Sequence, residues 1–439
     1  MTIIELGEAY GAEPVEPPPP AVRRRGLRRW GSAAVLALLL GTVAGAAPAP
    51  RPVPLAGIDA APGAAIALAE GRLLVVEPPG VSAERSTTVA AYRLPDAAPL
   101  WRTTLSRPLP GTVRLVGITH EVVLVTADPP VNSPSGEADA VALTVGTGTE
   151  TWWGPLGDAA FTAGGDLLLM DGADGGLRFR SVAARTGAER WSYRLPPEAI
   201  WSVGVRRDRA VDLVVGLPSG RVERRSTDTG AVLAAADLPR PARGESGPSW
   251  GIEVLGDLLL VSDGRGGQAA YGLDRLDRRW ELDLSGNAGG GWPSDCGPVI
   301  CLGSPPPITI RAVDRRTGRP LWELADWQPY WSVGGYLIAA QETPGAGERG
   351  SKAAVDAGSG RVTSRLDGWD LPQPPEGDSR LLGVRYLPDG AWLAELDPAT
   401  GASRPFGLLR GASRDCVRGP GVVVCRRYDG SIGVWRQPA

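Results

Sequence analysis

The amino-acid sequence predicts an all-β protein built as a propeller, a ring of similar four-stranded sheets. Three observations support this fold. The composition stays uniform from about residue 55 to the end of the 439-residue chain, which holds 60 glycines and 42 prolines. Short apolar runs alternate with turn residues throughout that region, as in chains made of many short strands. One motif also recurs along the chain at roughly the 40–45 residues of a single propeller blade.

The recurring motif joins an apolar strand, a Thr-Gly turn and a second strand that carries tryptophan. Its clearest copies are AVDRRTGRPLW (312–322), SVAARTGAERW (181–191) and ALTVGTGTETWW (142–153). Weaker copies occupy residues 90–101, 224–234, 271–280, 353–363 and 394–404. One such module cannot shield its own apolar faces, so we expect the modules to shield one another around a ring.

Each unit divides into four short strands. Asp-Gly steps, as in MDGADGG, mark the second hairpin of a unit, and the Thr-Gly turn marks the last. Glycine suits these turns because it tolerates the positive φ that tight hairpins require. The tryptophan then falls on the outer strand, where a large flat side chain can pack against the neighbouring blade. These outer-strand positions are Trp101, Trp153, Trp191, Trp280 and Trp322.

The motif resembles the PQQ-like β-propeller repeat, AxDxxTGxxxW, over about residues 55–439, and Asp314, Thr317, Gly318 and Trp322 match it closely. The resemblance implies seven or eight blades and, in many extracytoplasmic bacterial members, a first hairpin linked by cysteines. The chain holds eight units and a C-terminal remnant that lacks an outer strand, which residues 53–60 can supply to close the ring. A literal count gives nine blades. Treating one weak unit as an insertion, we expect eight, within a range of seven to nine, in a propeller spanning residues 58–439.

The N-terminal region predicts a tether. An arginine cluster, RRRGLRR (23–29), precedes the uncharged apolar run WGSAAVLALLLGTVAGAA (30–47) and should remain cytoplasmic. We expect residues 1–29 to form a cytoplasmic Pro/Arg-rich tail, 30–48 a transmembrane helix acting as signal anchor, and 49–57 a Pro/Ala-rich linker. The alternative is a cleaved signal peptide, since the apolar core is short and Ala44-Gly45-Ala46 resembles a cleavage site. Both alternatives place the propeller outside the cytoplasm, on the membrane or secreted.

The four cysteines fall as two close pairs, Cys296 with Cys301 and Cys416 with Cys425. A turn signal, Gly419-Pro420-Gly421, separates the second pair, so its cysteines can face each other across a hairpin. We expect two local disulfides in an oxidising compartment. A zinc site is the weaker alternative, because the spacings are not C-x₂-C and the only histidine is remote.

Several functional classes lack their usual residues. A formal net charge of −3 gives no electrostatic footprint for nucleic acid. Quinone-dependent enzymes of the fold that the chain resembles use adjacent cysteines, and none are adjacent here. His120, the only imidazole, lies in a strand-like apolar stretch that suits a strand-end histidine better than a catalytic one. Asp171 and Asp174 could approach calcium, but a hairpin turn explains them better. We therefore expect no catalytic residue, cofactor or metal site.

A second set of tryptophans recurs where the chain should cross from one blade to the next. If these side chains gather around the central funnel, they form an aromatic anchor for a partner. The alternative is that each fills a gap between blades. The candidate partner-binding residues are Trp201, Trp250, Trp292, Trp327, Tyr330, Trp331 and Trp369.

The sequence thus favours a non-catalytic, extracytoplasmic binding or scaffold domain of a bacterial protein. We expect a monomeric propeller that engages a protein, a peptide or an envelope polymer through one face of the ring. Two alternatives stay open: a divergent quinone-dependent or sugar-acting enzyme, and a structural propeller without a specific ligand.

Overall fold

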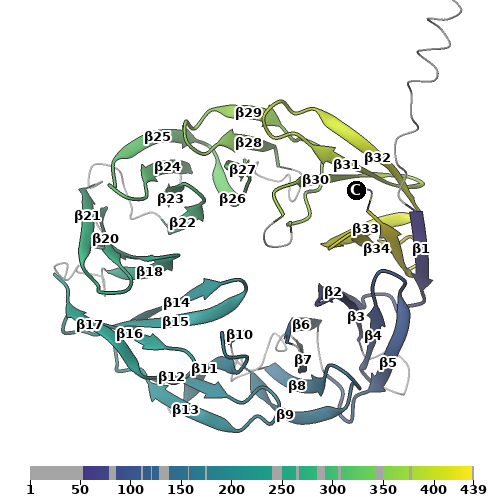
Figure 1. The fold of residues 1–439 in the computed structure, drawn as a ribbon, viewed down its shortest axis with the longest axis horizontal. Coiled ribbons are helices and arrows are strands. Elements are labelled where there is room, and N and C mark those ends of the chain that lie inside the picture. The colour runs from purple at the N-terminus through teal and green to yellow at the C-terminus, as the bar shows by residue number, and fades with distance from the viewer. Residues whose placement is uncertain are drawn as a thin grey trace, which may run out of the picture. The chain divides into compact units, whose positions relative to one another are not determined.

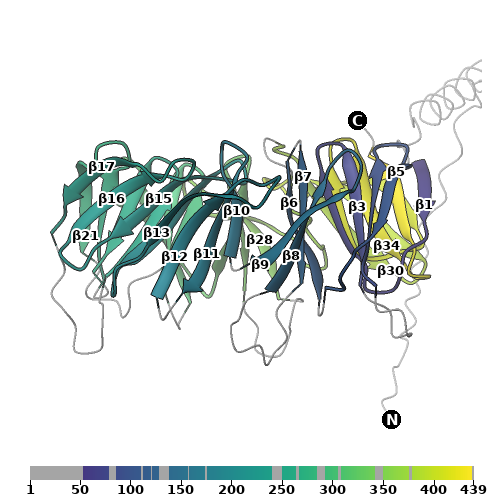
Figure 2. The same cartoon turned by 90° about the horizontal axis from the view of Figure 1, so that it is seen from below.

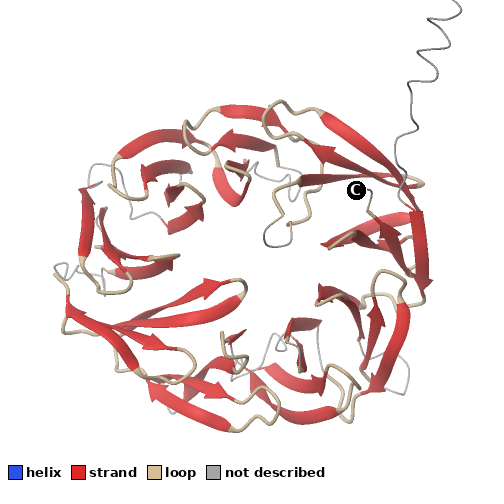
Figure 3. Cartoon of the chain, viewed as in Figure 1, coloured by secondary structure: helices blue, strands red, loops and turns tan. Residues whose placement is uncertain are grey.

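The structure, a computed structural model, describes residues 53–78, 86–109, 112–119, 121–127, 138–156, 158–173, 176–239, 250–263, 266–283, 292–304, 308–341, 350–374 and 378–437. Every regular element in these ranges is a β-strand (Figure 3). Within them no helix is long and apolar enough to span a membrane. The predicted transmembrane helix (30–48), the cytoplasmic tail (1–29) and His120 lie outside the described residues.

The described strands form nine sheets arranged around a common centre, so the molecule is a β-propeller (Figures 1 and 2). Within each sheet the strands pair antiparallel in chain order from the inside outward, except that the outer strand of the last blade is β1. Blades 1 to 3 comprise β2 (Ala65–Ala69), β3 (Arg72–Glu77), β4 (Thr88–Arg93), β5 (Ala98–Thr104), β6 (Val113–Ile118), β7 (Val122–Ala127), β8 (Ala138–Thr144), β9 (Glu150–Leu156), β10 (Asp158–Phe161), β11 (Leu167–Ala173), β12 (Gly176–Val182) and β13 (Glu189–Arg194).

The remaining blades continue in the same order around the ring. Blades 4 to 6 comprise β14 (Ile200–Arg206), β15 (Arg209–Gly216), β16 (Arg221–Ser226), β17 (Val232–Asp237), β18 (Gly251–Leu255), β19 (Leu258–Ser262), β20 (Gly267–Gly272), β21 (Arg278–Asp283), β22 (Trp292–Cys296), β23 (Val299–Ser304), β24 (Thr309–Asp314) and β25 (Pro320–Ala325). Blades 7 to 9 comprise β26 (Gln328–Val333), β27 (Tyr336–Ala340), β28 (Lys352–Asp356), β29 (Val362–Arg365), β30 (Leu381–Leu387), β31 (Gly390–Leu396), β32 (Ser403–Arg410), β33 (Ala412–Gly419), β34 (Val422–Arg427), β35 (Ile432–Arg436) and β1 (Val53–Ile58).

The hydrophobic core lies between blades. The second strands read as apolar runs because both of their faces are covered; all six residues of β7, for example, are buried. One core cluster combines Leu74 and Val89 of blade 1 with Val123 and Val141 of blade 2. The outer strands instead alternate between exposed and half-buried residues. Each blade therefore shields its neighbour, as the repeat predicts.

The expected count of eight blades is wrong, and the literal count of nine is right. No weak unit is an insertion: residues 224–234, 353–363 and 394–404 each join the two outer strands of a blade. A blade needs an apolar strand pair and a turn residue that accepts positive φ. It does not need every letter of the motif, and for this reason degenerate units still fold as blades.

The ring closes as the sequence predicts. β1 supplies the outer strand of blade 9 and pairs antiparallel with β35, with Val53 opposite Arg436 and Ile58 opposite Ile432. The propeller therefore begins at Val53, inside the segment expected to be a linker (49–57). Joining the first and last strands in one sheet means that the ring cannot open without breaking this ladder.

Blade 8 departs from the four-stranded pattern, because its innermost strand is reduced to one bridge. Asp370 and Val384 exchange two backbone hydrogen bonds of 2.8 Å beside β30. The pairing stops there because Pro372 and Pro374 follow, and proline has no N–H to donate to a ladder. The segment is thus free to turn toward the centre of the ring.

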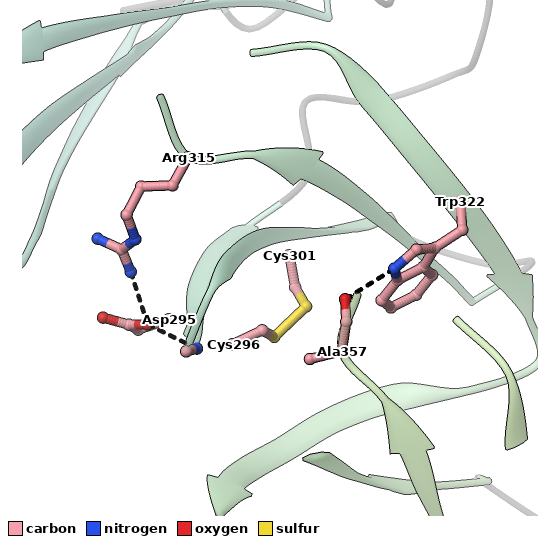
Figure 4. Close-up of a disulfide and its surroundings, with 7 residues drawn as sticks. Asp295, Cys296, Cys301, Arg315, Trp322 and Ala357 are labelled. Atoms are coloured by element: carbon pink, nitrogen blue, oxygen red, sulfur yellow. Dashed lines mark hydrogen bonds and ion pairs between the residues drawn. A yellow bond between two sulfur atoms is a disulfide. The ribbon is translucent and has the colours of Figure 1, made fainter. Parts of the chain in front are cut away.

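Both expected disulfides are present. Cys296–Cys301 joins β22 to β23 in blade 6, and Cys416–Cys425 joins β33 to β34 in blade 9, with Cα–Cα distances of 5.8 and 4.1 Å. Figure 4 shows the first of them next to Asp295, near the end of β22. Each bond links the first and second strands of its blade.

A tryptophan clamp connects successive blades. The indole N–H of an outer-strand tryptophan donates to a carbonyl in the last turn of the next blade, as Trp322 does to Ala357 at 2.9 Å (Figure 4). The ring lies on the glycine of that turn, where a Cβ atom would come within 3.0 Å of the indole. The clamps pair Trp101 with Gly148, Trp152 with Gly187, Trp191 with Gly230, Trp280 with Gly318 and Trp322 with Gly360.

One of the predicted outer-strand tryptophans, Trp153, does not contact the next blade through a clamp. In blade 2 Trp152 forms the clamp, and the indole of Trp153 donates to Glu150 instead. Residues on a strand alternate between faces, so only one of two adjacent tryptophans can point toward the next blade. The doubled Trp-Trp sequence made the choice ambiguous.

Two junctions keep the contact without tryptophan. Between blades 7 and 8 the Ser364 hydroxyl donates to Pro398, the carbonyl equivalent to Ala357. Between blades 4 and 5 both partners change together. Ala234 stands at the tryptophan position, and Leu276, with a φ of 57°, replaces the glycine and is buried in the core beside it. At this junction the small residue is on the outer strand and the large residue is in the turn, the reverse of the tryptophan clamp.

We predict that Gly360→Ala destabilises the protein more than Gly71→Ala. Both glycines have a φ of 71°, so the backbone cost of about 1 kcal/mol is shared. A Cβ at Gly360 would lie 2.5 Å from the Trp322 ring, whereas nothing lies within 4 Å at Gly71. The Gly360 variant should lose about 2 kcal/mol more in urea unfolding followed by fluorescence. Equal losses would show that the clamp contributes no packing.

We also predict coupling between Ala234 and Leu276. Ala234→Trp should overpack the junction and Leu276→Gly should empty it, each costing about 2 kcal/mol. The double variant recreates the clamp and should be at least about 1 kcal/mol more stable than the sum of the single losses predicts. Additive losses in the same unfolding assay would contradict the exchange of sizes.

Candidate functional site

One face of the ring carries the turns that join first to second strands, and we call it the hairpin face. The last turn of each blade lies on the same face, because the strands are antiparallel and consecutive. In blade 6, Arg315 of the last turn pairs with Asp295 of the first turn at 2.7 Å (Figure 4). The connections between blades lie on the opposite face.

A cavity of about 1150 Å³ opens on the hairpin face. The first turns of blades 1, 4 and 9 line it, together with Trp331 and Ser332 of blade 7 and part of the segment that precedes β30 in blade 8. Its walls therefore combine segments from both ends of the propeller sequence and from its middle. We call it the central cavity.

The β14–β15 hairpin forms the wall on the blade 4 side, and in Figure 1 it reaches toward the centre of the ring. Its turn residues Arg207 and Asp208 both have positive φ, 52° and 54°, which gives a turn with the twist of the strands. The β14–β15 register shifts between Gly204 and Val205, just before the turn, and Val205 is 54% exposed at the cavity. An exposed valine beside charged residues gives the cavity one apolar contact point.

An arginine cluster forms the wall on the blade 8 and 9 side. The Arg418 side chain from β33 is only 1% exposed and forms an ion pair with Asp378, and it donates from Nη1 to the Arg380 carbonyl at 3.0 Å. Asp378 also accepts from the Arg380 guanidinium, at 3.3 Å from Nε and 3.2 Å from Nη2. One carboxylate is thus shared by two guanidinium groups.

The cluster shifts both partners. Burial alone would raise the pKa of Asp378, but hydrogen bonds from Arg380 and the charge of Arg418 outweigh it and hold that pKa below its usual value. Burial lowers the pKa of Arg418, although the guanidinium stays charged at any pH of interest. The cluster is therefore a fixed positive charge in the cavity wall.

The predicted aromatic ring is only partly present. Trp201 packs edge-on against Phe179, with ring centroids 5.3 Å apart. Trp250 is 7% exposed within the core between blades 4 and 5. Trp327 is 4% exposed, with the Arg365 guanidinium 4.9 Å from its ring centre. These three fill gaps inside and between blades, which is the alternative that the sequence left open.

Three further members of the set lie in blades 7 and 8. Tyr330 is 63% exposed because it occupies a bulge in β26, where the register shifts between Pro329 and Trp331. Trp331 lines the central cavity and Trp369 is half-buried under Arg385, with 4.3 Å from guanidinium to ring centre. Trp292 begins β22, and the structure does not describe its side chain.

Of the predicted residues whose side chains the structure describes, only Trp331 lines the central cavity. Sequence reasoning missed Arg418, Asp378, Arg72 and Gln437, which also line or border it. A single arginine near the end of a strand carries no sequence signal of its own, and these residues come together only when the ring closes. The regular tryptophan spacing reflects packing, because inter-blade gaps recur with the blade.

The aspartates considered for calcium are Asp171 and Asp174, and the described residues hold no group of side chains that could bind a metal ion. Asp171 is occupied by arginines: Arg178 Nε donates to it at 3.1 Å and Arg180 Nε at 2.5 Å. Its neighbour Asp174 lies outside the described residues.

A groove of about 910 Å³ also lies between blades 8 and 9, where Trp392 is 40% and Tyr428 57% exposed. Sequence reasoning did not single out this pair.

Comparison with protein families places the chain. A family model described as outer membrane protein assembly factor BamB, a PQQ-like propeller, matches residues 85–322, more than half of the 439 residues. The chain belongs to this family. The resemblance inferred from the repeat is confirmed. No curated protein sequence matches the chain.

Several solved structures match with low identity. The crystal structure of BamB from Moraxella catarrhalis is 16% identical with a TM-score of 0.46, covering 88% of this chain and 100% of that chain. The computationally designed Ika8 protein is 12% identical (TM-score 0.42, 88% and 100% covered). The C-terminal WD40 domain of Sif2 is 10% identical (TM-score 0.43, 89% and 99% covered).

We predict that Asp378→Asn lowers stability by about 2 kcal/mol at pH 6, because it leaves the buried Arg418 without its counter-charge. The folded state lowers the pKa of Asp378, so its contribution is present above about pH 4 and is lost as the pH falls through the folded pKa. The difference from the native protein should shrink toward pH 3 in thermal melts. Asp274→Asn is the control, since Asp274 is 89% exposed in its pair with Arg224, and it should change little.

Proposed function

We propose that this protein is a non-catalytic scaffold of the cell envelope that binds a protein or peptide partner through the central cavity on its hairpin face. The observation that carries the proposal is the cavity itself. It combines an exposed valine, a tryptophan and fixed arginine charges from several blades on a rigid ring. A rigid site that joins one apolar contact to a few polar groups is suited to selective binding.

The family supports a protein partner. Its model is described as an outer membrane protein assembly factor, and by that likeness we propose that the partner is a protein of the envelope. The hairpin face can hold such a partner without closing around it, since the cavity is open and its walls belong to tightly paired strands. Binding of this kind requires little rearrangement of the propeller.

A binding role also fits the residues available for chemistry. All four cysteines of the sequence form disulfides, so none serves as a thiolate nucleophile. The carboxylate at the cavity wall, Asp378, is held ionised by two arginines and is poorly suited to donate a proton. The alternative of a divergent quinone-dependent or sugar-acting enzyme has less support from these residues.

The disulfides and the N-terminal segment support an extracytoplasmic location. Two disulfides within hairpins persist in an oxidising compartment. The arginine cluster followed by an apolar run suits an anchor with the propeller outside the cytoplasm. We propose a single-pass membrane protein with its N-terminus inside.

We predict that a photo-cross-linking amino acid at Val205 or Gln373, both at the central cavity, captures one and the same protein in the native cell envelope. The same amino acid at Val232, which is 46% exposed on the outer strand of blade 4, should capture none. The readout is a discrete adduct of higher mass, identified by mass spectrometry. Adducts at Val232 alone, or different proteins at the two cavity positions, would contradict the assignment of the binding face.

A further inference from the structure

We infer that the part of the central cavity between blades 9 and 1 binds an acidic segment of an extended peptide. This inference rests on the proposed function and deepens it, because it names the chemistry that the partner presents. The site consists of Arg72 from blade 1 and Arg418, Arg436 and Gln437 from blade 9, all of which line the cavity.

Gln437 provides the first observation. Its backbone N–H donates to the Gly421 carbonyl at 2.9 Å, which fixes the residue beside the first turn of blade 9. The residue is only 5% exposed, yet neither its side-chain oxygen nor its side-chain nitrogen has a hydrogen-bond partner. A buried amide without partners is costly, so a native protein keeps one where a bound group satisfies it.

The same deficit recurs elsewhere in the cavity wall. Arg72 Nε, Arg418 Nε and Trp331 Nε1 are also buried without a partner, and all three residues line the cavity. In Arg418 one terminal nitrogen donates to Asp378 and the other to the Arg380 carbonyl, so Nε is the guanidinium nitrogen without a partner. The unpartnered groups are three N–H donors and one amide, which offers both a donor and an acceptor.

The charge of the site favours an anion. Four arginines (Arg72, Arg207, Arg418 and Arg436) and three acidic residues (Glu70, Asp208 and Asp378) line the cavity. Asp378 is already shared between Arg418 and Arg380, so it neutralises only part of this charge. Arg436, exposed beside Gln437, adds a guanidinium at the opening. A carboxylate is the ligand that such guanidinium groups bind best in a peptide.

The amide selects a peptide over other anions. A primary amide matches the donor and acceptor of a backbone peptide group, and the remaining N–H donors suit carbonyl or carboxylate oxygens. Val205, across the cavity, offers an apolar contact for a neighbouring side chain. Together these groups fit an extended segment with Asp or Glu next to a residue of moderate size.

The test uses the full-length protein and the peptide Val-Glu-Gly-Glu-Val-amide, labelled with fluorescein at its N-terminal amine, in a polarisation assay at low salt. The matched peptide with glutamine in place of both glutamates should bind at least about tenfold more weakly, since it keeps the backbone but removes the charge. Unlabelled acidic peptide and a glucuronate-containing tetrasaccharide are then compared as competitors of the labelled acidic peptide. Competition by that sugar as strong as by the acidic peptide would overturn the assignment to a peptide.

Two variants separate binding from folding. Gln437→Met removes the unpartnered amide with little change in volume, and it should weaken peptide binding about tenfold without lowering the melting temperature. Gln268→Met is the matched control, because Gln268 in blade 5 is also 2% exposed with an unpartnered amide but does not line the cavity. This control should leave binding unchanged.

The outcomes are distinguishable. Loss of binding in Gln437→Met alone supports the site. Three results would overturn it: equal binding of the acidic and glutamine peptides, equal loss of binding in both variants, or unchanged binding by a Gln437→Met variant that melts at a lower temperature. The third result would indicate that the Gln437 amide binds water only. If the cross-linked partner still binds the Gln437→Met protein, the scaffold function stands and only the acidic-peptide site fails.

Discussion

The architecture depends on one repeated contact, the indole of an outer strand lying on the last turn of the next blade. The contact needs a flat side chain on one blade and a turn without a Cβ on the next, and it adds a hydrogen bond from the indole N–H to the turn carbonyl. Tryptophan and glycine are therefore two halves of one interaction, even though they lie in different repeats. This explains why the motif shows both residues while neither is needed within its own blade.

The junction between blades 4 and 5 shows that the contact is constrained in shape more than in residue type. Leu276 accepts a left-handed backbone, uncommon outside glycine, and fills the space that Ala234 leaves open. The Ser364 hydroxyl at another junction keeps the hydrogen bond but not the ring. What these two junctions share with the clamps is a close contact between the outer strand of one blade and the last turn of the next.

The sequence predicted the fold because strand alternation, turn glycines and the tryptophan are local features that repeat with each blade. It predicted the closing strand because the remnant at the C-terminus lacked one. It misjudged the blade number because one of the weak units was treated as an insertion, although every weak unit joins two strands of a blade. The tryptophan period did not mark the central cavity: Trp250 and Trp327 recur at the blade period because they fill gaps that recur with the blade.

The central cavity exists where the blades differ from one another. The β14–β15 hairpin of blade 4 extends inward, the prolines of blade 8 end its innermost strand early, and the first turn of blade 9 carries the buried Arg418. Regular blades stabilise the ring, whereas these local departures cost stability through positive φ, missing ladder bonds and unsatisfied polar atoms. Since they converge on one face from distant parts of the chain, the ring supplies rigidity and the exceptions supply the cavity that we propose as the binding site.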